Sequence, residues 1–315
     1  MKQPDPMSIL SRRGFVAAAL GAVPALEAAR PKGVLVDTHI HLFEPERFPY
    51  HANATYRPPA EPLDKYLRFV AGSRIDHAVI VHPEPYQDDH RYLEYCFQNE
   101  PRPGFFKGTC LFDPVAAQTP RRMEALVKKH KDRIVALRIH VNREAGRPPT
   151  VTGAIRDRDL KAPAMKDTWR AAHEFGLAIQ MHFIPVHAPG IGELAAAFPL
   201  TAVILDHIGR AGQGTPAQFE QVLALARLPR VYLKFSGVTY SSRQDYPHDD
   251  AQPLVRRAAE AFGANRILWG GLGMNLAEFD RRVALLDRMF AFLPEVDRAR
   301  IRGENAVRLF GFRAL

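Results

Sequence analysis

The sequence predicts an α/β protein whose single domain is a (β/α)8 TIM barrel. Short, almost continuously hydrophobic runs recur along the chain, and amphipathic helical patterns separate them. Parallel strands that are buried on both faces have this composition, and eightfold strand–helix alternation is typical of a closed barrel. The expected strands are 34–42, 77–83, 105–114, 134–141, 177–185, 202–209, 231–238 and 266–271.

The helical patterns between these runs have apolar residues at three- and four-residue spacing. They cover 62–73, 88–99, 120–130, 164–175, 215–226, 253–262 and 276–292, with a weaker pattern at 190–198. A doubly wound open sheet is the alternative fold, and it would need a glycine-rich phosphate turn after the first strand. That strand ends instead in the run DTHIH at 37–41, which favours the barrel.

Composition excludes several classes of protein. The chain has 315 residues, of which 46% are hydrophobic and 24% charged, so a fibrous or intrinsically disordered protein is excluded. No apolar stretch of about 18 residues occurs, which argues against stable membrane insertion. The net charge is +9, but the basic residues are scattered, so we expect no nucleic-acid partner. The expected partner is a small-molecule substrate, and the sequence leaves a homo-oligomer open.

The first thirty residues have features of an export signal. The run SRRGFV at 11–16 resembles the twin-arginine motif, and a modest apolar run follows to Leu26. Glu27 interrupts the small residues that a cleavage site would need. We expect residues 1–30 to be a signal segment, residues 31–315 to form the barrel, and the protein to be periplasmic. A frayed N-terminal helix is the alternative, and it would leave the protein in the cytoplasm.

Six histidines fall at the C-terminal ends of expected strands: His39, His41, His82, His140, His182 and His207. His39 and His41 are two residues apart, so in a strand they share a face, roughly 7 Å apart along the backbone. His182 ends the fifth strand, where an imidazole costs stability unless it is paired or ligated. Together they would supply three nitrogens, and three protein ligands plus water is the usual geometry of catalytic zinc. His207 ends the sixth strand and could orient water or a substrate carbonyl; a buried structural histidine is the alternative at each position.

Six segments occur in an order that is typical of a known family. They are VDTHIH (36–41), MH (181–182), LDHIG (205–209), YLKFSG (232–237), RILWG (266–270) and GENA (303–306). On these segments the chain resembles the amidohydrolase-related branch of metal-dependent TIM-barrel hydrolases, which includes lactonases and non-oxidative decarboxylases. The resemblance implies that His39, His41 and His182 face a divalent metal ion, zinc before others, and that His207 is catalytic. It also leaves metal-free catalysis open, as in some lactonases of this branch.

One position departs from the family pattern. Members of the family have Gly-Ser-Asp after the eighth strand, and the aspartate is the catalytic carboxylate. This chain has GGL at 270–272, so Leu272 stands in the aspartate position. Leucine can neither bind a metal ion nor take a proton from water, and the loss of a general base typically costs about 10²–10⁴ in rate.

Three other carboxylates are near the expected centre. Asp37 is expected to share the face of His39, where it could bind the metal ion or support a ligand. Asp113 lies near the end of the third expected strand. Asp206 is a candidate catalytic residue, although a regular strand would point it away from the face of His207.

Cationic residues on the strands indicate an acidic substrate. The fourth strand carries Arg138 and His140, which we expect to contact the substrate, and it has no lysine that could form the bridging carbamate of a two-metal site. Arg138 suits a substrate carboxylate, with an internal aspartate as the equal alternative. Lys234 in the seventh strand faces either the barrel mouth or a helix.

The leading hypothesis is a metal-dependent hydrolase that opens a lactone or a similar cyclic, carboxylated carbonyl compound. A divalent ion, or the histidines alone, would polarise the carbonyl, while His207 and Asp206 manage protons. Non-oxidative decarboxylation at the same site is the first alternative. The second is a degenerate exported binding protein that lost turnover with the strand-eight aspartate.

Overall fold

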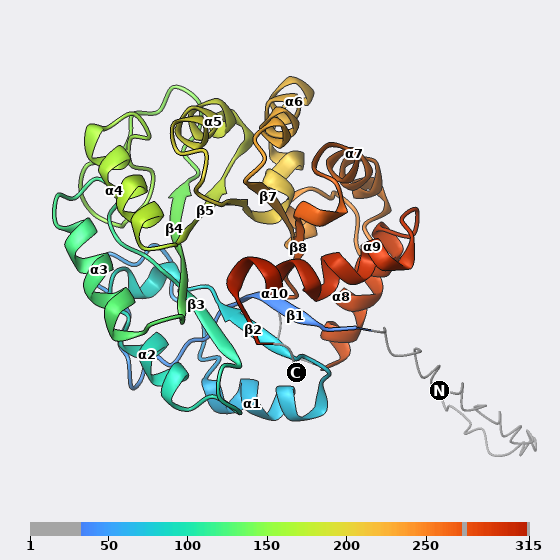
Figure 1. The fold of residues 1–315 in the computed structure, drawn as a ribbon, viewed down its shortest axis with the longest axis horizontal. Coiled ribbons are helices and arrows are strands. Elements are labelled where there is room, and N and C mark those ends of the chain that lie inside the picture. Colours follow the sequence, from blue (N-terminus) through green and yellow to red (C-terminus); the bar gives the residue numbers. More distant parts are fainter. Residues whose placement is uncertain (1–32, 273–275, 314–315) are drawn as a thin grey trace, which may run out of the picture. The chain divides into compact units, whose positions relative to one another are not determined.

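The computed structural model describes residues 33–272 and 276–313. Within them, eight parallel strands pair in chain order. The strands are β1 Val36–Ile40, β2 His77–Ile80, β3 Phe106–Cys110, β4 Ile134–Val141, β5 Ala178–Phe183, β6 Val203–Leu205, β7 Val231–Phe235 and β8 Ile267–Trp269. β8 returns beside β1, where Thr38 Oγ1 donates a hydrogen bond of 2.6 Å to the carbonyl of Trp269 (Figure 1). The predicted TIM barrel is therefore confirmed.

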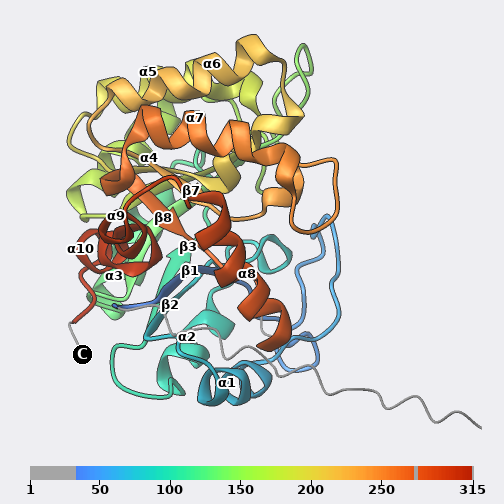
Figure 2. The ribbon, with the colours of Figure 1, turned by 90° about the vertical axis from the view of Figure 1, so that its right-hand side faces the viewer.

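Helices surround the ring of strands. They are α1 Leu63–Gly72, α2 Arg91–Gln98, α3 Thr119–Lys129, α4 Pro163–Glu174, α5 Ala188–Ala197, α6 Pro216–Ala224, α7 Gln252–Phe262, α8 Leu276–Met289, α9 Glu295–Ala299 and α10 Asn305–Phe310. In Figure 2, α5, α6 and α7 lie on one side of the barrel and α1 and α2 on the opposite side. The predicted helices agree with α1 to α8 within a few residues, whereas α9, α10 and the π-helical turn between them were not predicted.

Two predictions about membranes and export have different outcomes. No helix in the described part of the chain has the length and hydropathy needed to cross a bilayer. The predicted signal segment, residues 1–30, lies outside the described residues. Export, periplasmic location and the domain boundary at residue 30 therefore stay predictions.

The hydrophobic core has two parts, and the inner part closes one end of the barrel. A large cluster fills the space between strands and helices, and a smaller one lies within the ring of strands. The smaller cluster joins strand residues such as Val36, Val79 and Leu268 to Phe310 and Phe312 at the C-terminal end of the chain. Figure 1 shows α10 crossing this end of the barrel. A substrate must therefore enter at the opposite end, where the strands have their carboxyl ends.

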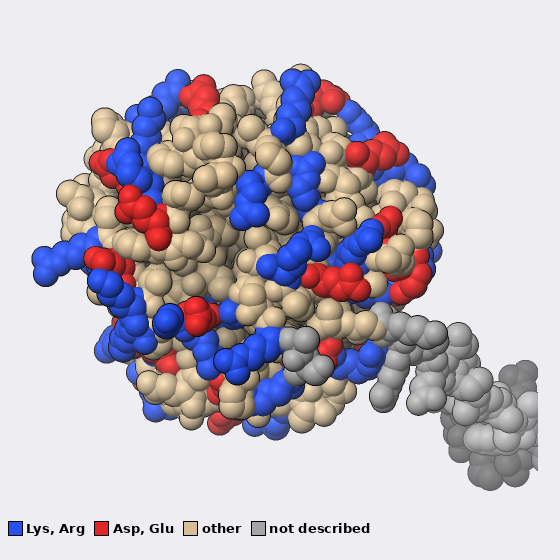
Figure 3. Space-filling model, in the orientation of Figure 1, with Lys and Arg blue, Asp and Glu red and all other residues tan. Residues whose placement is uncertain are grey.

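Charge is mixed on the end that α10 covers. Figure 3 shows Lys and Arg side chains distributed around this face with Asp and Glu between them. Arg302, for example, contacts both Asp287 and Glu295, at 2.8 and 2.7 Å.

A bulge in β1 decides which of its side chains reach the barrel interior. Asp37 pairs with Ala78 and Ile40 pairs with Ile80, so three steps along β1 match two steps along β2. One extra residue reverses the alternation of faces. Ile40 belongs to the outer core, so its neighbour His39 points inward, while Asp37 lies on the outer side of the bulge. The expectation that Asp37 shares the face of His39 is therefore wrong.

Candidate active site

His39 in β1 and His41 directly after it converge at the carboxyl end of the barrel, as predicted. The Nε2 atoms of His39 and His41 are 3.2 Å apart. The Nδ1 atom of His41 lies 2.7 Å from the carbonyl oxygen of Val81. The Nδ1 atom of His39 lies 3.7 Å from Oδ1 of Asp206. Each imidazole thus has one nitrogen toward its partner and one toward an oxygen.

The hydrogens of this pair cannot all be placed favourably without a cation. The Val81 carbonyl can only accept, so His41 Nδ1 carries its hydrogen and Nε2 presents a lone pair. If His39 carries its hydrogen on Nε2, the lone pair on its Nδ1 faces Oδ1 of Asp206, and the two electron-rich atoms repel each other. If the hydrogen is on Nδ1, two lone pairs face each other at 3.2 Å. A cation held by both Nε2 atoms removes this conflict, and the outer nitrogens then donate to oxygens, as they do in metal-bound histidines generally.

A proton is a poor substitute for that cation. Burial lowers the pKa of His39 well below its ordinary value, and Lys234 lowers it further. Burial also lowers the pKa of His41 to about 3. Both imidazoles are therefore neutral near pH 7, and a metal ion fits the pair better than a proton does.

Asp206 lies at the centre of a buried ionic cluster. Its Oδ2 accepts hydrogen bonds from Arg138, at 3.0 and 3.2 Å, and from the Gln180 amide at 3.0 Å. Lys234 Nζ lies 3.4 Å from Oδ1, which resolves the orientation of Lys234 in favour of the barrel interior. Burial alone would raise the pKa of Asp206, but Lys234 and Arg138 outweigh it and hold the pKa well below its usual range. The carboxylate is permanently ionised, and Arg138 is paired with an internal aspartate.

A turn after β6 brings Asp206 and His207 into the same space. His207 has left-handed backbone angles, φ 56° and ψ 45°, which end the strand alternation. Its Nδ1 lies 2.9 Å from Oγ of Ser236. The ring centroids of His207 and His39 are 4.8 Å apart. The expectation that Asp206 points away from His207 is therefore wrong, because it assumed a regular strand.

The tightest group of possible metal ligands differs from the predicted one. Among the described residues, His39, Asp206 and His207 offer ligand atoms that all lie within 4.8 Å of one another. His182 is not in this group, although its ring centroid is 5.3 Å from that of His207. The Nε2 atoms of His182 and His140 are buried without a hydrogen-bond partner in the described part of the chain. The predicted site residues thus share one region, with His182 and His140 at its edge.

The turn after β8 contributes backbone rather than a carboxylate. Leu272 has φ 57°, and its N–H donates to the carbonyl of His39 at 3.1 Å. The departure from the family pattern therefore lies at the site. Leu272, an apolar residue hydrogen-bonded through its N–H to His39, follows β8 at the position where the resemblance implies an aspartate.

The other two candidate carboxylates do not reach the centre. Asp37 Oδ1 accepts hydrogen bonds from the backbone N–H groups of His39 and Gly271, at 2.9 and 2.7 Å. A Cβ at Gly271 would lie 2.6 Å from Asp37 Oδ2, so this approach requires glycine. Burial raises the pKa of Asp37 to about 6. Asp37 therefore connects β1 to the β8 turn, while Asp113 pairs with Arg158 at 2.8 Å.

A cleft of about 470 Å³ opens beside His140 and His182. It is lined by Thr55, Tyr56, Glu84, His140, Asn142, Glu144, Arg156, His182, Ile184, Arg210 and Gln213. Arg210 donates to Asn142 Oδ1 at 2.6 Å, and its Nε is buried with no partner among the described residues. Arg156 contacts Asp157 at 2.9 Å. The lining thus carries two guanidinium groups, of Arg156 and Arg210, and two carboxylates, of Glu84 and Glu144.

Sequence reasoning missed several residues of the site. Gln180 and Ser236 each lie two positions from a residue that was considered, His182 and Lys234, so the same period-two argument would have found them. No comparable signal identifies Arg210, because its place follows from the left-handed turn that includes it.

The barrel and its contents define a class of protein. Histidines, a buried carboxylate and fixed cations gather at the carboxyl ends of parallel strands, which is where TIM-barrel enzymes have their active sites. The chain belongs to the amidohydrolase family, because the family model "Amidohydrolase" matches residues 36–312. The predicted resemblance and the predicted hydrolase class are confirmed.

Known proteins that resemble this chain align with almost its whole length. It is 27% identical over 287 residues to a 4-sulfomuconolactone hydrolase of Hydrogenophaga intermedia, covering 87% of this chain and 88% of that protein. It is 24% identical over 298 residues to an L-fucono-1,5-lactonase of Burkholderia ambifaria, covering 87% and 94%. A zinc-bound amidohydrolase structure from Burkholderia multivorans superposes with a TM-score of 0.68, at 18% identity and 89% and 100% coverage.

Proposed function

We propose that this protein hydrolyses a lactone, or a similar cyclic ester, that carries an acidic group. The observation that carries the proposal is the convergence of the His39 and His41 Nε2 atoms, 3.2 Å apart at the end of the barrel where a cleft lined by His140 and His182 opens. Such a pair is suited to holding a Lewis acid against a carbonyl oxygen. Both curated relatives are named as enzymes that act on lactones, which supports this substrate class.

The residues present fit one divalent cation, and we propose zinc. His39 and His41 would hold it, and His182 brings a third buried imidazole nitrogen that has no partner among the described residues. When bound, the ion would supply Lewis acidity for the carbonyl. Imidazole ligands suit zinc, and the similar structure with bound zinc agrees with this choice.

His207 is the proposed proton acceptor for the attacking water. When Ser236 Oγ accepts a hydrogen bond from Nδ1, the lone pair of His207 is on Nε2 and is available for a proton. Burial lowers the pKa of His207 to about 3, and Asp206 opposes this shift. The imidazole is thus neutral before reaction, and Asp206 stabilises the imidazolium that forms. We assign Asp206 this electrostatic role, because its Oδ2 accepts hydrogen bonds from Arg138 and Gln180, and Lys234 Nζ lies 3.4 Å from its Oδ1.

Arg210 and Arg156 are the proposed anchors of the acidic group. Both line the cleft with His140 and His182. We expect Arg138 to act on the substrate less directly, because two of its nitrogens are bound to Asp206. His140, whose Nε2 has no partner in the described part of the chain, is proposed to contact the substrate.

Metal analysis and a lactone assay test this function together. Protein purified without chelators should contain about one zinc ion per chain and should hydrolyse acidic lactones. The double variant His39→Ala/His41→Ala should lose both the metal and the activity. Full activity after exhaustive metal removal would contradict the metal assignment, and absence of hydrolysis across γ- and δ-lactones with carboxylate or sulfonate groups would contradict the function.

We also propose export by a twin-arginine route. Support comes from the SRRGFV run and the apolar segment that follows it. Replacing Arg12 and Arg13 by lysine should abolish the periplasmic pool in cell fractionation. An undiminished periplasmic pool would contradict this route.

A further inference from the structure

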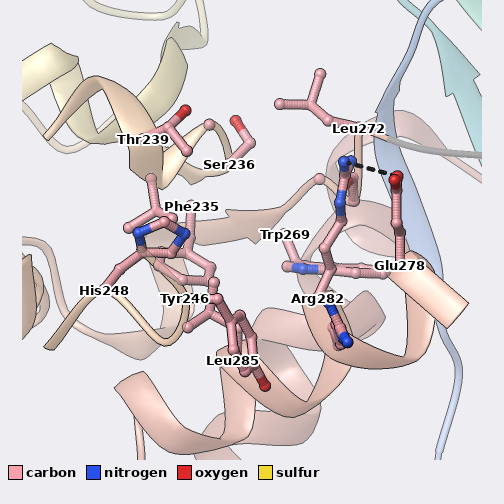
Figure 4. Close-up of a pocket in the computed structure, with 15 residues that line it drawn as sticks. Phe235, Ser236, Thr239, Tyr246, His248, Trp269, Leu272, Glu278, Arg282 and Leu285 are labelled. Atoms are coloured by element: carbon pink, nitrogen blue, oxygen red, sulfur yellow. Dashed lines mark hydrogen bonds and ion pairs between the residues drawn. The ribbon is translucent and has the colours of Figure 1, made fainter. Parts of the chain in front are cut away.

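A second pocket lies beside the site, between the carboxyl ends of β7 and β8 and helix α8 (Figure 4). Its volume is about 250 Å³, and its lining is mostly apolar. Phe235, Trp269 and Leu285 form buried parts of its wall, and Leu272 and Thr239 lie at its upper edge in the view of Figure 4. Nothing in the proposed reaction so far uses this space.

Only glycine backbone separates the pocket from two catalytic histidines. Gly270 and Gly237 both line the pocket. A Cβ at Gly270 would lie 2.6 Å from Cβ of His39, and a Cβ at Gly237 would lie 2.7 Å from Nδ1 of His207. Ser236 faces both spaces, since it lines the pocket and contacts His207 at 2.9 Å. The pocket and the two histidines therefore lie on opposite sides of the same glycine turns, and Ser236 is the side chain that is in contact with both.

The cationic side chains at the rim are already engaged within the protein. Arg281 stacks over the ring of Tyr246, with its Cζ 5.9 Å from the centroid. Arg282 donates to the carbonyl of Gly271 and lies 3.5 Å from Glu278, the contact drawn in Figure 4. These groups do not require an anion as partner, so the buried apolar wall decides what the pocket accepts.

We propose that this pocket binds an apolar arm, alkyl or aryl, attached to the ring of the lactone. The inference rests on the proposed function, because that function places the ester carbonyl at the histidines. It also gives a physical role to Leu272. An aspartate there would put a charge at the edge of an apolar pocket, and burial of a charge without a partner is costly. Leu272 is thus a specificity residue, and the acidic group and the apolar arm of the substrate enter different pockets.

The test is a series of γ-lactones that differ only in the length of an alkyl arm. Burial of each methylene contributes about fourfold in kcat/KM, so a butyl arm should give the wild type a preference of roughly 10²-fold over the unsubstituted ring. Thr239→Phe, which adds a ring at the pocket edge, should reduce this preference at least tenfold. Leu285→Ala, which enlarges the pocket, should move the optimum to longer arms.

Val296→Phe is the matched control. Val296 is on α9 and 56% exposed, so the same added ring there should leave the preference unchanged. The proposal is overturned if the wild type shows no preference for the alkyl arm, or if Thr239→Phe retains the full preference.

Fluorescence of Trp269 separates failure of the pocket from failure of the proposed function. The chain has two tryptophans, and Trp269 lines the pocket, so Trp169→Phe leaves a single reporter there. A bromobutyl-substituted lactone should quench this fluorescence in a stopped-flow mixing experiment, and Thr239→Phe should abolish the quenching. Quenching without any turnover would support the pocket while the hydrolytic function fails. Absence of quenching would overturn the pocket whatever the turnover.

Discussion

The two ends of the barrel contain different kinds of buried side chain. At the carboxyl ends of the strands, imidazole nitrogens of His140 and His182 are buried without a partner among the described residues. At the other end, Asn305 donates to the carbonyls of Ala264 and Ile267, each at 2.7 Å, and apolar rings close the ring of strands. Buried polar groups are normally satisfied, and exceptions such as His77 Nδ1 also occur at the closed end. The carboxyl ends are distinguished by the grouping of several imidazoles beside a cleft, and this grouping marks the end that binds a ligand. Stability and function are therefore separated along the barrel axis, and this separation can be tested.

The largest effect is expected at the open end. His207→Asn removes the proposed proton acceptor and should lower kcat/KM for an acidic lactone by about 10²–10⁴. The melting temperature should change little, because His207 contacts neighbours through one hydrogen bond and ring contacts. Steady-state kinetics and calorimetry check both parts, and a loss of activity below threefold would remove His207 from the mechanism.

A mutation at the closed end should lower stability and leave activity unchanged. Phe310→Ala removes a buried ring from the inner core and should cost about 3–5 kcal/mol in the free energy of unfolding. Urea denaturation measures this cost, while kcat of the remaining folded protein should equal that of the wild type. A large drop in kcat at low temperature, with the fold intact, would show that the two ends are coupled.

Leu272→Asp restores the carboxylate of the family at the open end. The left-handed backbone at this position, φ 57°, accommodates aspartate more easily than leucine, so the fold should tolerate the change. We expect turnover of an unsubstituted lactone within about tenfold of the wild type, because His207 already accepts the proton. If the variant instead creates activity in a protein that has none, the wild type is a degenerate binding protein.

The smallest effect concerns the pH dependence of the closed end. Hydrogen bonds from Arg302 and Arg298 lower the pKa of Glu295 to about 2, from 4.5. The ionised form is thus favoured by folding, and its contribution is present above about pH 4.5 and lost as the pH falls toward 2. Compared with Glu295→Gln, the wild type should be slightly more stable at pH 6 and equal at pH 2 in urea titrations. A difference that is independent of pH would refute the assignment.

Local patterns were sufficient for the architecture and for part of the site. Each strand lies within a predicted apolar run, and the pairing follows chain order. The convergence of His39, His41, His182 and His207 on one region was predictable, because parallel strands bring their carboxyl ends together. The export signal remains a prediction from the sequence alone.

Other features depended on contacts between distant segments. Arg138 had two equal interpretations until Asp206 was found against it. The cleft beside His140 and His182 joins residues that lie in or after β1, β2, β4, β5 and β6, and the second pocket joins the ends of β7 and β8 to α8, so neither has a local signature.

The sequence by itself determined the order of strands and helices, the barrel class and the histidines at its mouth, because hydrophobic periodicity and strand polarity are local properties. Only the tertiary structure decided that Asp37 is outside and Asp206 inside. One extra residue in β1, defined by its pairing with β2, and a run of left-handed residues after β6, from His207 to Arg210, each reverse the direction of a side chain. A period of two residues cannot reveal such a reversal, since it is set by the neighbouring strand and the turn.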